Sequence, residues 1–280
     1  MAVLAEVGRA VAVLVEVGSV NFQLRIINYE LRIVMSWNKI QISQHKQAGR
    51  LLDKIIVDVA NFIKNNPDTT DVAVRQFIKK QYGKYNLKSD KEKSICAFGK
   101  NTSFVHFFAD KPDRLRENSL ILIDIWARLD ESGAPFADIT WMMYFGKNMP
   151  AEYEEIFQIV VGARDEAVKF FKKNLQKKII PTGKEVDLIV KKYLDKHGHL
   201  DKFLHGTGHS LGFFSPHGNR TRISRKGRQV IPLNVGYTIE PGVYFKNKFG
   251  CRSEIDFYID ENYKLIITTK VQKKIIKINL

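Results

Sequence analysis

The chain has 280 residues, 44% of them hydrophobic, which is enough to bury a sizeable core and excludes a chain too polar to fold. Its two cysteines are too few for a disulfide framework and lack the paired spacing of a zinc ribbon, which indicates a reducing compartment. The net charge of +15 would suit a nucleic-acid partner, but the basic residues are scattered, mostly as pairs, so we predict a solvated basic surface and no dedicated nucleic-acid site.

Residues 1–34 stand apart from the rest of the chain. The segment Ala2–Gly8 is nearly repeated as Ala12–Gly18, a short imperfect duplication that carries no chemical motif. Charged residues interrupt this apolar stretch, so we predict no membrane span, no secretory signal and a cytoplasmic location. The segment is either a strand-forming appendage or dimer arm, or an extension from an upstream start codon, and we favour the extension. The main domain is predicted over residues 35–280.

Two helices are predicted at the start of the main domain. Between Ser43 and Lys64, apolar residues recur at the spacing of one helix face. The segment Asp68–Asp71 then offers capping side chains for a second helix, which is expected to end near Tyr82.

A hairpin is predicted next, and it carries two aspartates. Strands are expected at residues 94–99 and 119–127, and a strand at 136–145 completes a hairpin with the second of these. Asp124 and Asp138 each lie between apolar strand residues. A carboxylate in such a place needs a cation, a network of donors or a raised pKa. The pair on adjacent strands is therefore a candidate cation site.

The same order of elements is predicted again in the second half. Helical patterns cover residues 152–173 and 182–194, and β-rich segments follow at 237–244, 251–259 and 264–269. Two helices with strands, followed by two helices with strands, predict an α+β fold of two similar halves around a shared sheet. Such halves bring ligands from both ends of the chain together.

The most specific string in the chain is His205-Gly-Thr-Gly-His209-Ser-Leu-Gly212. Its glycines permit a close backbone approach to a ligand, and histidine supplies a nitrogen ligand or carries a proton. Within fifty residues, Glu240 and Glu254 each place an acid on an otherwise apolar strand. The combination favours a functional site over separate structural residues.

Four carboxylates and one imidazole form the predicted ligand set. Such hard, oxygen-rich ligands suit a pair of Mn²⁺, Co²⁺, Fe²⁺ or Zn²⁺ ions that activates water, which favours a hydrolase. The candidate metal ligands are Asp124, Asp138, His209, Glu240 and Glu254.

These motifs resemble those of the pita-bread metallopeptidases, which include Xaa-Pro aminopeptidases, prolidases, methionine aminopeptidases and creatinase. The similarity covers roughly residues 35–280 and implies an α+β pita-bread fold, with two similar α/β halves around a shared curved antiparallel sheet. The matching strings, in the family's order, are Leu122-Ile-Asp124, Ala137-Asp138-Ile-Thr140, His205-Gly-Thr-Gly-His209-Ser-Leu-Gly212, Thr238-Ile-Glu240-Pro-Gly242 and Gly250-Cys-Arg-Ser-Glu254.

The resemblance implies a role for each ligand. Asp124 is expected to be a terminal ligand of one metal, His209 and Glu240 to bind the other, and Asp138 and Glu254 to bridge the two. A bridging water or hydroxide is expected to attack the scissile carbonyl, and Glu240 to carry the proton. Manganese is expected as the metal, with Co, Zn and Fe as alternatives.

The resemblance also implies roles for three further histidines. His106 matches a substrate-facing histidine near the leaving nitrogen, and His217 matches one that steadies the tetrahedral intermediate. His205 is expected to line the substrate pocket beyond the scissile bond. The Gly-Cys-Arg-Ser-Glu-Ile-Asp and His-Gly-Thr-Gly-His strings look like the Xaa-Pro aminopeptidase and prolidase branch. The expected substrate is therefore a peptide with proline at the second position, and the expected assembly is a homodimer.

The chain departs from that branch in several places. The two aspartates are 138 − 124 = 14 positions apart, a longer hairpin than usual, and Trp141 stands where many members have arginine. We expect these changes to reshape the substrate pocket without disturbing the metals. The segment between His209 and His217 is one residue longer than in close relatives. Cys251 is expected to be either sensitive to oxidation or, as we favour, a buried inert thiol.

Two other functions remain open at this point. Some proteins of this fold have lost their ligands and bind peptides, histones or RNA, and others, like creatinase, hydrolyse a small carbon–nitrogen substrate. All five ligands are present here, which favours an enzyme over a binding module.

Overall fold

The computed structural model describes residues 4–7, 10–13, 36–91, 94–108 and 111–279, and it divides into two compact units. The first unit, Met1–Ser36, contains the strands β1 (Leu4–Val7) and β2 (Ala10–Val13), which pair antiparallel. The predictions for residues 14–34 lie outside the described part of the chain. The second unit, Trp37–Leu280, holds all the elements described below.

Two helices open the second unit, as predicted. Helix α2 (Lys39–Asn65) starts earlier than expected, because Asn38 and Gln41 form a capping box in which each side chain accepts the other's backbone N–H at 2.9 Å. Helix α3 (Asp71–Lys84) is capped by Thr70, whose hydroxyl accepts from the Ala73 N–H. Among the described residues, no helix has both the length and the apolar character that a membrane crossing requires.

The predicted hairpin forms the centre of a five-stranded sheet. Strands β5 (Ser119–Leu129) and β6 (Ala137–Phe145) pair antiparallel along their length. Strands β4 (Ile95–Phe98) and β3 (Leu87–Lys88) pair with β5, with the 3-10 helix η1 (Gly99–Ser103) after β4. Strand β12 (Ile276–Ile278), which sequence patterns did not predict, pairs parallel with β6.

The two faces of this hairpin belong to two separate cores. Successive strand residues point to opposite faces, so the odd-numbered residues of β5 pack towards α2 and α3, and the even-numbered ones pack towards α4. We call these clusters the α2-side core and the α4-side core. Because both faces are covered, the strands read as continuous apolar runs rather than alternating ones. Asp124, Asp138 and Thr140 all lie on the α4-side face.

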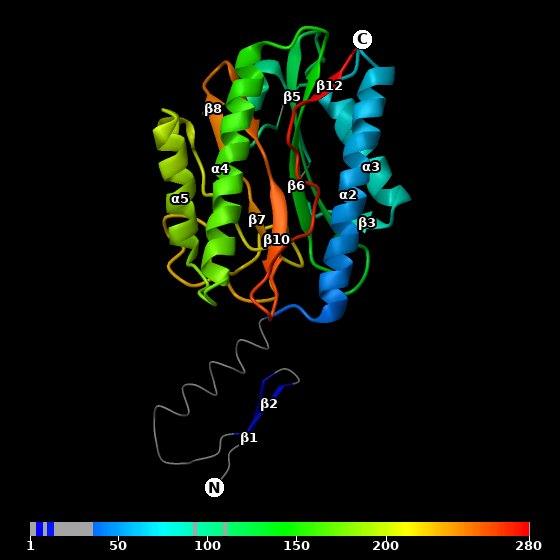
Figure 1. Cartoon of the computed structure of the whole chain (residues 1–280). Coiled ribbons are helices and arrows are strands. Elements are labelled where there is room, and N and C mark those ends of the chain that lie inside the picture. Colours follow the sequence, from blue (N-terminus) through cyan, green and yellow to red (C-terminus); the bar gives the residue numbers. More distant parts are fainter. Residues whose placement is uncertain (1–3, 8–9, 14–35, 92–93, 109–110, 280) are drawn as a thin grey trace. The chain divides into compact units, whose positions relative to one another are not determined.

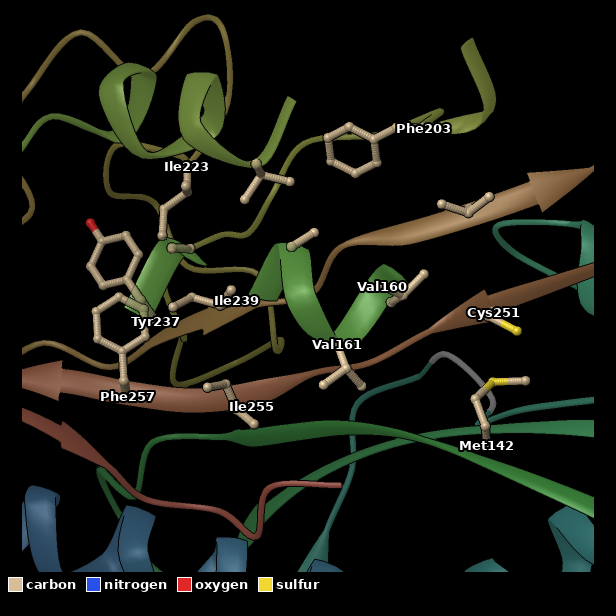
Figure 2. Packing of buried hydrophobic residues seen from close by; sticks show 14 of the residues in the cluster. Met142, Val160, Val161, Phe203, Ile223, Tyr237, Ile239, Cys251, Ile255 and Phe257 are labelled. Atoms are coloured by element: carbon tan, nitrogen blue, oxygen red, sulfur yellow. The ribbon is translucent and has the colours of Figure 1, made fainter. Parts of the chain in front are cut away.

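The second pair of helices covers the opposite side of the sheets from α2 and α3 (Figure 1). Helix α4 spans Ala151–Leu175, and α5 spans Gly183–Lys196 and begins with a capping box between Thr182 and Glu185. The 3-10 helix η2 (Leu200–Lys202) follows. Figure 2 shows the α4-side core where Val160 and Val161 of α4 lie over strands β7 and β10.

The last strands correct the prediction from the sequence. Each of the segments 237–244 and 251–259 was predicted as one strand, and each is broken in two. The first segment forms β7 and β8, the second forms β9 and β10, and Glu240 and Glu254 lie at the two breaks. β7 pairs with β10, β8 pairs with β9, and β11 pairs with β10. The strands are β7 (Tyr237–Ile239), β8 (Gly242–Phe245), β9 (Phe249–Arg252), β10 (Ile255–Ile259) and β11 (Leu265–Ile267).

Pro241 explains the break between β7 and β8, and a hydrogen bond to Pro241 explains why the break between β9 and β10 lies beside it. Pro241 has no N–H to give to a ladder, so pairing stops there. The Ser253 N–H donates to the Pro241 carbonyl at 3.2 Å, which places the second break beside the first. Both predicted glutamate ligands therefore lie where the chain leaves one sheet for the next.

His45 on α2 links the helix to two distant segments of the chain, and its burial leads us to expect a pH effect on stability. It is fully buried, its Nδ1 donates to the Phe136 carbonyl at 2.9 Å, and its Nε2 accepts from the Thr268 hydroxyl at 2.7 Å. Burial lowers the pKa of His45 to about 4. Between about pH 6.5 and pH 4 the unfolded chain binds a proton here and the folded chain does not, so this contribution to stability is lost as the pH falls.

We expect His45 to contribute about 3 kcal/mol to the loss of unfolding free energy over that pH range. Denaturant unfolding of the full chain and of His45→Gln, measured from pH 7 to pH 4, tests this. The difference in unfolding free energy between the two proteins should shrink as the pH falls. Parallel pH curves for the two proteins would contradict the assignment.

Candidate metal centre

A cavity of about 240 Å³ lies on the α4-side face of the β5–β6 hairpin. Its size falls below the roughly 300–1,000 Å³ that is usual for ligand pockets, so it suits a small ligand. All eight residues predicted for the site line this cavity, although they come from segments far apart in the chain. They are Asp124, Asp138, His209, Glu240, Glu254, His106, His205 and His217.

Three of the predicted ligands form a compact cluster. Asp138, His209 and Glu254 are buried, and each offers one ligand atom such that all three atoms lie within 4.8 Å of one another. The His209 Nε2 lies 3.7 Å from Asp138 Oδ2 and 3.4 Å from Glu240 Oε1. Its Nδ1 lies 3.0 Å from the Ser210 carbonyl, which can only accept, so the proton is on Nδ1 and the lone pair of Nε2 faces the carboxylates.

The glycine-rich loop sets the position of His209 by pairing with the start of β7. The Thr238 N–H donates to the His209 carbonyl at 2.9 Å, and the Glu240 N–H donates to the Thr207 carbonyl at 2.8 Å. A Cβ at Gly208 would lie 2.1 Å from the Thr238 carbonyl oxygen, so this close approach requires glycine. The buried Asp187 of α5 anchors the loop by accepting from the Thr207 hydroxyl at 2.9 Å. The ligands His209 and Glu240 are thus held in register by backbone hydrogen bonds.

A buried network links the remaining ligands. The Arg252 guanidinium donates through Nη2 to Asp124 Oδ2 and through Nε to the Thr140 hydroxyl, the latter at 2.9 Å. The Thr140 hydroxyl in turn donates to Glu254 Oε2 at 2.7 Å. Arg252 and Thr140 were predicted only as parts of motif strings, without a role of their own. The signal available for Thr140 was its place directly opposite Asp124 in the hairpin.

The carboxylates in this cavity lie close enough together to repel one another. Burial, and then the neighbouring acids, raise the pKa of Asp138 and of Glu254 well above the ordinary range. Burial also raises the pKa of Asp124, against the opposing charge of Arg252. Among the described residues, the buried Oδ1 atoms of Asp124 and Asp138 have no hydrogen-bond partner.

These features fit bound divalent cations. Unpartnered carboxylate oxygens and an imidazole Nε2 that faces them are ligands for a hard or borderline ion, and a cation would relieve the repulsion. Asp124, Asp138, His209, Glu240 and Glu254 would hold the ions. Arg252 occupies one oxygen of Asp124 and leaves the other free for this purpose.

Glu240 differs from the other acids in its environment. Its side chain is 16% exposed, and it lies at the break between β7 and β8 rather than inside a strand. Burial raises the pKa of Glu240, but the combined effect of the neighbouring histidines and Arg252 is larger, so the net direction is downward. Glu240 is therefore the acid of this site best kept ionised.

The three other predicted histidines differ in what holds them. His205 is held on both sides, since its Nδ1 donates to the Gly206 carbonyl and its Nε2 accepts from the Tyr244 hydroxyl at 2.9 Å. Burial lowers the pKa of His205 to about 4, which suits a wall residue rather than a proton carrier. The ring of His217 lies 4.3 Å from that of His209, and His106 is exposed at the cavity.

Two departures noted in the sequence do not affect the cavity. Trp141 lies on the opposite face of β6 from Asp138 and packs against the α2-side core, so the expectation that it reshapes the substrate pocket is wrong. The length of the hairpin is accommodated in the turn at residues 130–136, outside the paired strands.

Cys251 is buried, and burial raises the pKa of its thiol, in agreement with an inert role.

Comparisons with known proteins point to one family. The profile of metallopeptidase family M24 matches residues 43–261. An uncharacterised peptidase of Methanocaldococcus jannaschii is 29% identical over 238 residues, and the Xaa-Pro dipeptidase of Pyrococcus furiosus is 28% identical over 235 residues. Each alignment covers 83% of this chain and 62% of the relative, so the chain spans less than two thirds of the length of these curated relatives.

A solved structure shows the same fold. The X-Pro aminopeptidase from Thermotoga maritima superposes with a TM-score of 0.76 at 23% sequence identity, covering 92% of this chain and 72% of that one.

Proposed function

Because the chain belongs to metallopeptidase family M24, we propose that it is a two-metal aminopeptidase that removes the residue preceding proline from short peptides. The pita-bread fold predicted from the sequence is confirmed by the solved relative. The observation that carries the proposal is the convergence of Asp138, His209 and Glu254 within 4.8 Å, beside Asp124 and Glu240 in one cavity. The relative named Xaa-Pro dipeptidase supports the choice of substrate.

In the proposed mechanism the ligands hold the metal ions, and Glu240 also moves a proton. Divalent ions bound at this site would supply an activated water and would polarise the scissile carbonyl. Asp138 and Glu254 would fix the positions of the ions. The hydrogen-bond network from Arg252 through Thr140 orients Asp124 and Glu254. Glu240 accepts the proton of the attacking water and passes it to the leaving nitrogen, which suits its partial exposure and lowered pKa.

Two histidines complete the proposed site. The ring of His217 lies 4.3 Å from that of His209, and in this proposal His217 donates to the oxygen that becomes negative in the tetrahedral intermediate. His106 is exposed at the cavity, and in this proposal it acts near the leaving nitrogen. An enzyme that acts before proline gains from such donors, because the imide nitrogen has no hydrogen of its own to bind.

Peptide hydrolysis by metal-stripped protein tests the proposal. Xaa-Pro dipeptides and Xaa-Pro-Yaa tripeptides are assayed with Mn²⁺, Co²⁺ or Zn²⁺ added back, and a methionine-first, proline-free peptide is the control. We expect release of the first residue only before proline and only with metal, with Mn²⁺ effective. Turnover of the control peptide at a similar rate would contradict the proline requirement. Turnover of creatine alone would favour a creatinase-like hydrolase, and no turnover with bound metal would favour a binding module.

Two basic side chains in the cavity wall predict a short substrate. Arg222 and Lys226 line the cavity on a loop that is fixed to the glycine-rich segment, because Gly208 and Ile223 exchange backbone hydrogen bonds of 3.1 and 2.9 Å. A carboxylate at the end of a dipeptide would pair with these cations, whereas a longer peptide carries its carboxylate further away.

We expect Arg222→Gln to raise the KM for a dipeptide about tenfold with little change in kcat, since a charge-assisted hydrogen bond contributes about 1.5–3 kcal/mol. A dipeptide amide, which has no carboxylate, should lose no affinity. Arg225→Gln is the matched control, because Arg225 is exposed on the same loop outside the cavity wall. Equal effects on the free acid and the amide would contradict a carboxylate contact.

The cytoplasmic location and the homodimer remain predictions of the sequence.

A further inference from the structure

An apolar surface borders the candidate metal centre on one side. In the sheet, Ile95 of β4 lies directly opposite Asp124, and Trp126 lies two residues beyond Asp124 on the same face of β5. Both Ile95 and Trp126 line the cavity. On the other side of Asp124, across β6, lies Thr140 with its hydrogen bond to Glu254. The apolar surface therefore borders both aspartates, because Ile95 lies opposite Asp124 and Trp126 lies opposite Asp138.

The indole of Trp126 is fixed in this surface. Its Nε1–H donates to Asp90 Oδ1 at 2.8 Å, and its backbone carbonyl accepts from the Ser89 hydroxyl at 3.0 Å. Trp126 is 5% exposed, so the ring is packed on most of its surface while one part faces the cavity. A ring held at both its polar end and its backbone does not move aside at low cost. Trp126 thus presents a rigid wall.

A second segment extends the apolar surface. Val105 and Phe108 also line the cavity, and the Val105 carbonyl accepts from Arg252 Nη1 at 3.1 Å. This contact ties the segment to the same arginine that orients Asp124. We call the four residues Ile95, Val105, Phe108 and Trp126 the apolar wall.

The charges of the cavity orient a substrate against this wall. The amino end of a peptide is attracted to carboxylates or their metals, and its carboxyl end is attracted to cations. Asp124 and Asp138 are the acids directly opposite Ile95 and Trp126 of the apolar wall, whereas Arg222 and Lys226 lie in the 220–228 loop. A substrate with its amino end at these two aspartates would therefore place its first side chain against the wall.

We propose that Trp126 is the residue that limits the size of the first side chain of the substrate. The proposal rests on the proposed function and deepens it: the preferred substrates have a small or medium apolar first residue, such as alanine or leucine, and an aromatic first residue is rejected. Trp126 acts by steric contact with the substrate and takes no part in the proton transfers.

Substrate series on matched tryptophan variants test the proposal. The values of kcat/KM for Ala-Pro, Leu-Pro and Phe-Pro are compared between the metal-loaded protein, Trp126→Ala and Trp126→Phe. We expect the ratio of Phe-Pro to Ala-Pro to rise at least about tenfold in Trp126→Ala and less in Trp126→Phe, since one or two carbon atoms in an apolar pocket change selectivity by about 10–200-fold. Trp126→Phe keeps an aromatic ring in the core and serves where the alanine variant does not fold.

Trp141→Phe is the matched control, because Trp141 lies on the same hairpin but faces the α2-side core. It should leave the ratio unchanged. An unchanged ratio in both Trp126 variants, with folded and metal-loaded protein, would overturn the proposal while leaving the proposed function intact.

Amino-acid binding separates this proposal from the proposed function. Titration calorimetry of the metal-loaded protein with alanine, leucine and phenylalanine needs no turnover. We expect leucine to bind more tightly than phenylalanine to the natural chain, and the order to reverse in Trp126→Ala. If no Xaa-Pro peptide is hydrolysed but this reversal occurs, the proposed reaction is wrong and the proposed role of Trp126 is supported. Equal affinity for leucine and phenylalanine in both proteins, or no binding of any of the three amino acids, would overturn the proposed role of Trp126.

Discussion

Replacement of Glu240 by alanine should lower kcat on an Xaa-Pro dipeptide by roughly a thousandfold and leave the fold intact. The loss follows from the proposed proton transfer, since a positioned general base contributes about 10²–10⁴-fold. The fold should survive because the Glu240 side chain is partly exposed at a strand break, and its contacts are the Thr238 hydroxyl at 3.1 Å and the His209 ring. Single-turnover and steady-state kinetics measure the loss.

Circular dichroism and thermal unfolding accompany these kinetics. Glu155→Ala is the matched control, because Glu155 is exposed on α4 and does not line the cavity. It should have the kcat of the natural chain. A folded Glu240→Ala protein that retains more than about a tenth of the natural kcat would remove Glu240 from the proton-transfer role.

Removal of bound metal should abolish hydrolysis and lower the melting temperature by roughly 5–10 °C. An ion that binds only the folded chain adds about 2.7 kcal/mol at one hundred times its Kd, and for a unit of this size each kcal/mol moves the midpoint by about 2–4 °C. The effect is large here because Asp138 and Glu254 are buried acids whose pKa values are raised by burial and by the neighbouring acids. Thermal unfolding with EDTA and with added Mn²⁺ measures it.

Asp138→Asn provides the decisive variant for this effect. Asparagine keeps the size of the side chain, and the backbone N–H of residue 138 can still donate to Asp256 Oδ2, a contact of 2.9 Å. We expect a folded protein whose melting temperature no longer responds to Mn²⁺. The same Mn²⁺-induced shift in Asp138→Asn and in the natural chain would place the ion elsewhere.

Much of the site could be predicted because its residue types are unusual in their surroundings. Carboxylates inside apolar strands are costly without a partner, so Asp124 and Asp138 were visible in the sequence, and crowded glycines marked the loop that carries His209. The helices were equally visible, since periodic apolar faces and capping residues are local signals. In each of these cases the information lies within a few residues of the element it describes.

The parts that escaped prediction depend on contacts between distant segments. The role of Arg252 arises from its hydrogen bonds to Thr140 and Asp124, residues more than one hundred positions away. The breaks in the last strands follow from a switch of sheet partners that a run of β-forming residues does not reveal. The position of Trp141 has a simpler cause, because side chains alternate along β6 and Trp141 therefore faces away from Asp138.

The division of the β5–β6 hairpin between two cores restricts how this protein can change in evolution. A single-residue insertion inside β5 would turn every following side chain to the other face, so Asp124 and the residues after it could not all keep their sides. The turn at residues 130–136 lies outside the paired strands and carries no such constraint. Lineages should therefore differ in the length of this turn while the spacing from Asp124 to the end of β5, and from the start of β6 to Thr140, stays constant.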